Sequence, residues 1–308
     1  MNGSLHTVEG RPVLRFERRL AHPPDKVWRA ITEPGHLSQW FPADIEGDRA
    51  PGAKLRFVFR DGEGPTMDGR ITVFDPPRVL AYTWGDAQLH WELRPDGDGC
   101  LLIFTHTFDD RPSAASFAAG WHGCLDALEL LLDGKPVEVA NRWAELHEDY
   151  VERFGLGEGA VEQTADGWTL RFERQLTQPV DKVWATMTGG AEAEAAGPPP
   201  LQVTNEYVAA GVVTAAEPPR LLEHTWLSEG REVGRVRWEL ADGPGGARLV
   251  LTQTVPADLA DQRPTALAAW HTHIELLASE LRGQTVCPWP KQRTEELREH
   301  YAGLLHRG

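Results

Sequence analysis

Two histidine–carboxylate pairs are the side chains best placed for chemistry in this 308-residue chain. Asp126 follows His122 by one helical turn, and Glu275 follows His271 at the same spacing. On a helix, such a carboxylate can orient the imidazole and raise its pKa, as a general base requires. Both histidines fall at the edge of an apolar helix face, where exposed ion pairs are common. We therefore favour an ion pair and keep a general base as the alternative.

The sequence contains no other motif for catalysis or metal binding. A histidine–carboxylate pair supplies two ligands, whereas a zinc site needs more, and neither HExxH nor GxSxG occurs. The three cysteines are far apart and form no CxxC, which is typical of reduced thiols in a cytosolic protein. We expect no metal, no cofactor and a cytoplasmic location, and the sequence inclines against an enzyme.

The acidic composition argues against nucleic acids and anionic membranes as binding partners of this protein. The net charge is −15, with 46 acidic against 31 basic residues. Nucleic acids and anionic membrane surfaces both attract concentrated Lys and Arg, so neither is expected as a partner. No stretch approaches the roughly 18 apolar residues of a membrane-spanning helix, and the N-terminus lacks the pattern of a signal peptide.

The elements that must position these side chains occur twice in the sequence. FERRL at 16–20 and DKVW at 25–28 return as FERQL at 172–176 and DKVW at 181–184. A repeat of about 150 residues has the size of a whole domain rather than of a solenoid unit. We expect two tandem domains, residues 1–158 and 159–308. Later markers recur in the same order, namely PPR at 76–78 and 218–220, WEL at 91–93 and 238–240, and WH at 121–122 and 270–271.

Each repeat begins with alternating apolar residues and ends with apolar residues spaced by three and four. The first pattern predicts strands and the second predicts a long helix. This helix should end at residues 133–134 in the first repeat and at Gly283 in the second. Between them lie two short helices, the second carrying Leu37, Trp40 and Phe41, and about six short strands joined by turns. This order favours an α+β fold with a curved antiparallel sheet around a long C-terminal helix.

The two repeats are unequal. The second has no counterpart of the Leu37-Trp40-Phe41 helix or of the strand that carries Leu55 and Phe59. In their place, residues 189–200 are rich in Ala, Glu, Gly and Pro, which predicts a loop. The second domain is therefore expected to be a degenerate copy.

Three segments resemble a known family. These are FERRLAHPPDKVWRAITEPGHLSQWFP at 16–42, FDPPRVLAYTW at 74–84, and GW before a Leu-rich helix. They resemble the family named for the activator of the 90-kDa heat-shock-protein ATPase. That family belongs to the START-like, or SRPBCC, superfamily of helix-grip domains. The resemblance covers most of 12–135 and, more weakly, 168–283. It implies a cavity between the concave sheet and the long helix, opening near the two short helices.

Seven residues of the first repeat are candidates for ligand contact in such a cavity. Four rings would line it, two rings would lie at its mouth, and one histidine would lie at its edge. The alternative is that these rings fill the interior by packing. In that order the candidates are Trp84, Trp91, Phe104, Trp121, Trp40, Phe41 and His122.

Three classes of function follow from the resemblance, because the superfamily fold alone does not decide between them. We favour a protein that binds a small apolar or amphipathic ligand, mainly in the first domain. One alternative is an enzyme similar to the didomain polyketide aromatase/cyclases. Another is a co-chaperone or scaffold, but the different N-terminal domain of the family's defining member is not found in this sequence. A chaperone partner is therefore not inferred.

Overall fold

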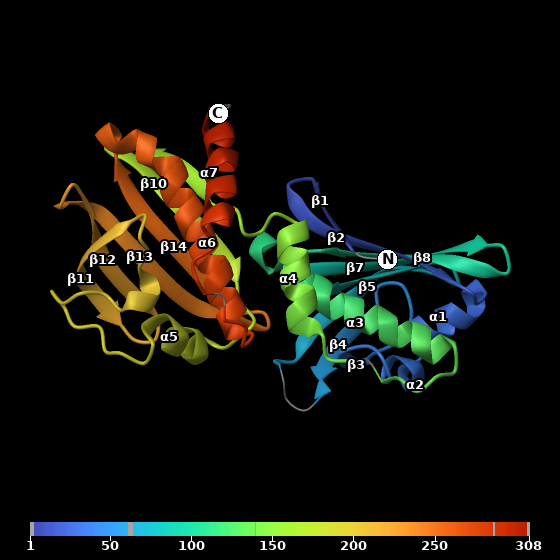
Figure 1. Ribbon diagram of the computed structural model, residues 1–308. Coiled ribbons are helices and arrows are strands. Elements are labelled where there is room, and N and C mark those ends of the chain that lie inside the picture. Colours follow the sequence, from blue (N-terminus) through green and yellow to red (C-terminus); the bar gives the residue numbers. More distant parts are fainter. Residues whose placement is uncertain (1–2, 61–63, 139, 286, 307–308) are drawn as a thin grey trace. The chain divides into compact units, whose positions relative to one another are not determined.

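Two separate antiparallel sheets, each with its own long helix, make up the computed structural model (Figure 1). The structure describes residues 3–60, 64–138, 140–285 and 287–306. The chain divides into the units Met1–Tyr150 and Val151–Gly308. The boundary between residues 158 and 159 that the repeat indicates stays a prediction, which proteolysis can test.

The first domain contains an eight-stranded sheet in the order β1-β2-β8-β7-β6-β5-β4-β3. Two short helices follow β2, and the long helix α3 follows β8, which is the predicted α+β helix-grip order. The strands are β1 Ser4–Val8, β2 Arg11–Leu20, β3 Ala43–Glu46, β4 Lys54–Phe59, β5 Met67–Asp75, β6 Val79–Trp84, β7 Ala87–Asp96 and β8 Gly99–Thr107. The helices are α1 Pro24–Thr32, α2 Pro34–Leu37, η2 Arg111–Ser113, α3 Ala114–Leu132 and α4 Trp143–Arg153, which crosses the division between the units.

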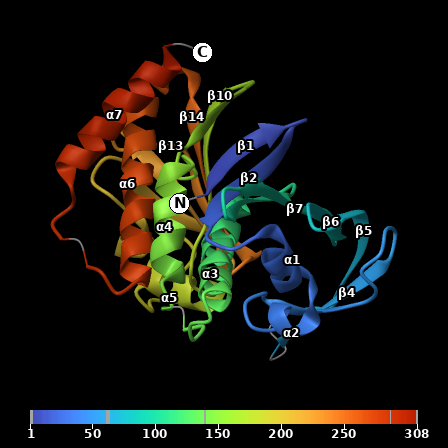
Figure 2. The ribbon, with the colours of Figure 1, turned by 90° about the vertical axis from the view of Figure 1, so that its right-hand side faces the viewer.

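The second domain contains a six-stranded sheet in the order β11-β12-β13-β14-β10-β9. The long helix α6 and the last helix α7 lie side by side (Figure 2). The strands are β9 Ala160–Thr164, β10 Gly167–Gln175, β11 Ala209–Glu217, β12 Leu221–Ser228, β13 Arg231–Gly243 and β14 Gly246–Pro256. The helices are α5 Val180–Thr188, η3 Leu201–Val203, η4 Ala257–Gln262, α6 Arg263–Leu281 and α7 Lys291–Leu305.

The two long helices end in the same way. Gly134 and Gly283 both adopt positive φ, at 68° and 77°. The amide after each glycine bonds back to the last helical turn, from Lys135 to Leu130 at 2.9 Å and from Gln284 to Ser279 at 3.0 Å. This is the C-terminal arrangement that glycine permits without a Cβ penalty. Both predicted helix ends are confirmed.

The structure corrects the predicted second short helix. Helix α2 ends at Leu37, and Trp40 and Phe41 follow in a turn whose amides still bond to the Leu37 carbonyl, at 3.2 and 2.9 Å. Both rings are nevertheless buried. In the second domain, residues 189–200 form no helix or strand, as predicted. Among the described residues, no helix is long and apolar enough to cross a membrane.

Candidate functional site

The aromatic side chains of the first domain form one connected cluster between the sheet and α3. Trp91 stacks on Phe104 with ring centroids 4.0 Å apart, and Phe104 lies 4.6 Å from Trp121. Trp40 contacts Trp91 at 5.7 Å, and Phe41 contacts Trp121 at 5.7 Å. Pairs at these distances contribute about 0.5–1.5 kcal/mol each beyond their area burial. Most of this cluster therefore has the geometry of a packed core.

A cavity of about 340 Å³ lies beside the cluster, against the first half of α3. Helix α3 carries Phe117 and Trp121 there, while Phe108 follows the end of β8. The large apolar side chains that line the cavity are Phe59, Met67, Trp84, Phe108, Phe117 and Trp121.

The seven predicted site residues separate into three groups. Trp84 and Trp121 line the cavity. Trp40 and His122 line a different, open groove of about 840 Å³ between α3 and residues 133–138 and 140–146. The remaining candidates, Phe41, Trp91 and Phe104, lie in the packed cluster and line neither space.

His106, Phe108 and Phe117 line the cavity, although the sequence reasoning did not select them. The signal for two of them was present. His106 and Phe108 continue, at every second position, the inward series that includes Phe104. Phe117 could have been found from its place on α3, one turn before Trp121.

Three residues of this apolar wall carry buried polar groups. No described residue forms a hydrogen bond with Nε1 of Trp84 or with Oγ of Ser116, and both residues line the cavity. His106 accepts a hydrogen bond at Nδ1 from Trp121 Nε1, at 3.1 Å. Burial lowers the pKa of His106 to about 3, so this imidazole is neutral near pH 7 and its proton lies on Nε2. Trp84 Nε1 and Ser116 Oγ are themselves buried, so the exposed wall of the cavity is almost wholly apolar.

His122 belongs to a chain of polar contacts that lies away from the cavity. The Gly3 amide donates to the Tyr150 hydroxyl at 3.0 Å, and that hydroxyl lies 2.9 Å from His122 Nδ1. His122 Nε2 lies 3.5 Å from the Asp126 carboxylate. Because the hydroxyl accepts from Gly3, it can donate its own proton to Nδ1 and leave the Nε2 proton facing Asp126. No lone pair of this imidazole is left to act as a base. Burial also lowers the pKa of His122, so its contact with Asp126 joins a neutral N–H and a carboxylate rather than two charges.

The second domain repeats the chain. Gly159 donates to the Tyr301 hydroxyl at 2.8 Å, and that hydroxyl lies 2.8 Å from His271 Nδ1. His271 Nε2 lies 3.3 Å from Glu275, which also pairs with Arg293 at 2.7 Å. We call each chain a glycine–tyrosine–histidine clamp. The glycine precedes the first strand of its domain, the tyrosine lies in the last helix and the histidine lies in the long helix, so the clamp connects these three elements.

The glycines of the two clamps lie close against the ends of phenylalanine rings. A Cβ on Gly3 would lie 2.5 Å from the Phe16 ring, and a Cβ on Gly159 would lie 2.4 Å from the Phe172 ring. Real Cβ atoms do not approach other atoms so closely, so only glycine fits at these two positions. Among the described residues, no group of three or more metal-binding side chains occurs.

Comparison with protein families supports the resemblance that the sequence of the first domain shows. Residues 21–133 match the model of the family described as "Activator of Hsp90 ATPase homolog 1-like protein". No curated protein matches the chain.

Several solved structures are similar in part. CalU16 from Micromonospora echinospora is 24% identical, with 50% of this chain and 93% of that chain covered and a TM-score of 0.41. The conserved protein of unknown function EF2215 from Enterococcus faecalis is 21% identical, with 49% and 89% covered and a TM-score of 0.42. DynU16, titled a putative protein in the dynemicin biosynthetic locus, is 19% identical, with 87% and 98% covered and a TM-score of 0.39.

Proposed function

We propose that this chain binds a small apolar or amphipathic molecule. The proposal concerns mainly the first domain, which belongs to the Activator of Hsp90 ATPase homolog 1-like family. The observation that carries the proposal is the 340 Å³ cavity lined by Phe59, Trp84, Phe117 and Trp121. Small-molecule sites are commonly apolar spaces of about 300–1,000 Å³ with a few placed polar groups. Each 100 Å² of apolar ligand surface removed from water contributes about 2.5 kcal/mol to binding.

The exposed wall of the cavity is almost wholly apolar, which favours an apolar ligand or the apolar part of an amphipathic one. Trp84 and Ser116 line the cavity, but Trp84 Nε1 and Ser116 Oγ are buried and leave almost no surface open to a ligand. The aromatic rings of the wall favour a flat ring system, which can stack on them or meet their edges.

The cavity favours binding over acid–base catalysis. Among the described residues, His106 is the one histidine that lines it, and burial lowers the pKa of His106 to about 3. An acid–base catalyst works best with a pKa near the operating pH. Near neutral pH this imidazole is therefore a fixed hydrogen-bonding group rather than a proton carrier. The proposal does not include a chaperone partner.

We assign the main site to the first domain. Its short helix α2 and strands β3 and β4 lie where the described part of the second domain has a loop and η3. Pro42 and Phe59 of this segment line the cavity, and Phe41 packs against Trp84 and Trp121. An apolar ligand shielded on more sides from water gains more burial energy.

A titration of the full-length protein with 1-naphthol tests the proposal, with isothermal calorimetry as the readout. Gly120 lies in α3, where it lines both the cavity and the groove, and a Cβ there meets nothing within 4 Å. Gly120→Leu should therefore fill the space and weaken naphthol binding at least tenfold. The same change should not lower stability, since leucine is a better helix former than glycine.

The matched control is Gly123→Leu, one turn further along α3. A Cβ on Gly123 would likewise meet nothing within 4 Å, but this residue lines the open groove and not the cavity. This variant should bind naphthol like the wild type. Equal loss in both variants, or no binding to the wild type, would refute the cavity as the site.

A further inference from the structure

A second space adjoins the cavity of the first domain, namely the open groove of about 840 Å³ beside α3. Two residues of α3, Gly120 and Cys124, line both the cavity and the groove. On the segment that follows α2, Trp40 lines the groove and Pro42 lines the cavity. The two spaces therefore meet at Gly120 and Cys124.

The border between the two spaces is open rather than filled by side chains. Three of the α3 residues that line the cavity, Phe117, Gly120 and Cys124, are partly exposed. A Cβ on Gly120 would meet no atom within 4 Å, and the same holds for Gly123, which lines the groove. A molecule in the cavity can therefore extend past Gly120 into the groove.

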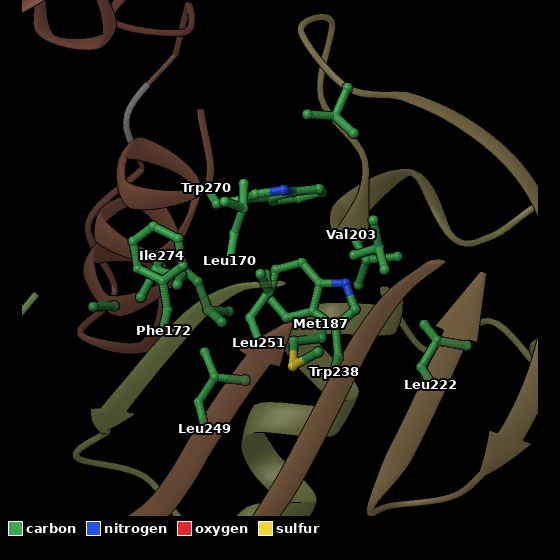
Figure 3. Close-up of a cluster of buried hydrophobic side chains, with 14 of the residues drawn as sticks. Leu170, Phe172, Met187, Val203, Leu222, Trp238, Leu249, Leu251, Trp270 and Ile274 are labelled. Atoms are coloured by element: carbon green, nitrogen blue, oxygen red, sulfur yellow. The ribbon is translucent and has the colours of Figure 1, made fainter. Parts of the chain in front are cut away.

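The second domain is closed at the corresponding positions. Counted from the clamp residues of the two domains, Thr272 of α6 and Thr294 of α7 take the places of Gly123 and Trp143. Both threonines are buried, and their hydroxyl oxygens lie 3.1 Å apart, so α7 packs directly on α6 there. Figure 3 shows Trp270 of α6 among the buried side chains that fill the interior of this domain.

In the first domain the same positions leave a space between the two helices. Gly123 and Trp143 both line the groove, and the Trp143 side chain is partly exposed. The groove therefore separates the beginning of α4 from α3. Further along α4, the Tyr150 hydroxyl lies 2.9 Å from His122 Nδ1 and holds the two helices together. The groove thus results from a difference between the two repeats in sequence, at positions that the clamps align.

The groove is polar, whereas the cavity is apolar. The charged residues that line the groove are Asp126, Glu129, Asp133, Glu138, Lys135 and Arg142. Most of these charges are already paired within the protein. Glu129 pairs with Arg18 at 2.9 Å and Asp133 pairs with Lys135 at 2.8 Å, while Arg142 pairs with a glutamate of α4 at 3.1 Å. The groove therefore suits an uncharged polar group better than a further ion.

We propose that the cavity and the groove form one site in two parts, and that its ligand is an amphipathic molecule with a flat apolar end and an uncharged, hydroxylated chain. The flat end occupies the cavity, and the chain passes Gly120 and Cys124 into the groove. A hydroxyl group can donate to the carboxylates there and accept from the cations. This inference rests on the binding function proposed above and narrows its class of ligand.

Isothermal calorimetry of the full-length protein with four related naphthalenes tests this inference. 1-Naphthol has no chain, and 3-(1-naphthyloxy)-1,2-propanediol has an uncharged, hydroxylated chain. (1-Naphthyloxy)acetate has an anionic chain, and 3-(1-naphthyloxy)propylammonium has a cationic one. The diol should bind at least tenfold more tightly than each of the other three, because its chain alone can donate to and accept from the groove without adding a charge.

Two glycine variants separate the two parts of the site. Gly123→Leu places a side chain in the groove alone. It should lower the affinity for the diol at least tenfold and leave the affinity for naphthol unchanged. Gly120→Leu, at the border of both spaces, should weaken the binding of both molecules.

The inference is wrong if the diol binds no more tightly than naphthol, or if either charged probe binds as tightly as the diol. It is also wrong if Gly123→Leu leaves the affinity for the diol unchanged. In each of these cases, binding of naphthol to the wild type would still support the cavity as a binding site. If naphthol does not bind to the wild type, the function proposed for the cavity fails, and this inference fails with it.

Discussion

Replacement of Tyr301 by phenylalanine should destabilise the second domain by about 2–3 kcal/mol. The hydroxyl accepts from the Gly159 amide and hydrogen-bonds to His271 Nδ1, each at 2.8 Å. Removing it leaves two largely buried groups unpaired, and each such loss costs about 1–3 kcal/mol. For a domain of this size, 1 kcal/mol corresponds to about 2–4 °C in Tm, so the transition should fall by roughly 5–10 °C.

Differential scanning calorimetry of the full-length protein measures this change. Tyr207→Phe is the matched control, because no hydrogen bond of the Tyr207 hydroxyl is described and its ring contacts Trp289. The control should melt within about 1 °C of the wild type. If Tyr301→Phe melts like the control, the clamp contributes nothing and the reasoning fails. Tyr150→Phe should produce a loss of similar size in the first domain, since its two hydrogen bonds are 3.0 and 2.9 Å long.

Three further outcomes are expected. Burial opposes ionisation of Glu275, but hydrogen bonds from His271 and Arg293 prevail and lower its pKa from 4.5 to about 2. The contribution of ionised Glu275 to stability is therefore present above pH 4.5 and lost as the pH falls toward 2. In thermal melts over that pH range, the stability advantage of the wild type over Glu275→Gln should shrink. A constant difference would contradict the lowered pKa. Trp121→Ala should cost about 3–5 kcal/mol by chemical denaturation, whereas an unchanged midpoint would mean that the ring does not support the core. Limited proteolysis should cut first near 155–166 or within 189–200. Resistance at both places with early cuts inside 70–130 would contradict the division into two domains.

The parts of the fold that could be predicted from sequence are those with strong periodicity. The long helices were predicted with their ends, because an apolar stripe and a terminal glycine are both local signals. Strands β1, β3 and β9 were missed. Each has four or five residues and several exposed positions, so alternation is too short to stand out, and pairing with a neighbouring strand decides their structure.

The candidate site was predicted only in part, because sequence shows that a ring is buried but not on which side of it space remains. Trp84 and Trp121 line the cavity, while Trp91 and Phe104 stack face to face behind it. The difference depends on packing between elements far apart in the chain. The same limit concealed the groove, because the glycines of the predicted long helix do not show that a later segment leaves space beside them.

The clamp glycines determine where the second domain can be excised. The Gly159 amide bonds to the Tyr301 hydroxyl, and the residue lies against the Phe172 ring. A fragment that began at Gly159 would replace this single N–H with a charged, hydrated amine inside a partly buried contact, and any side chain at that position would meet the ring. A second domain produced alone should therefore begin several residues earlier, so that position 159 remains an ordinary peptide link.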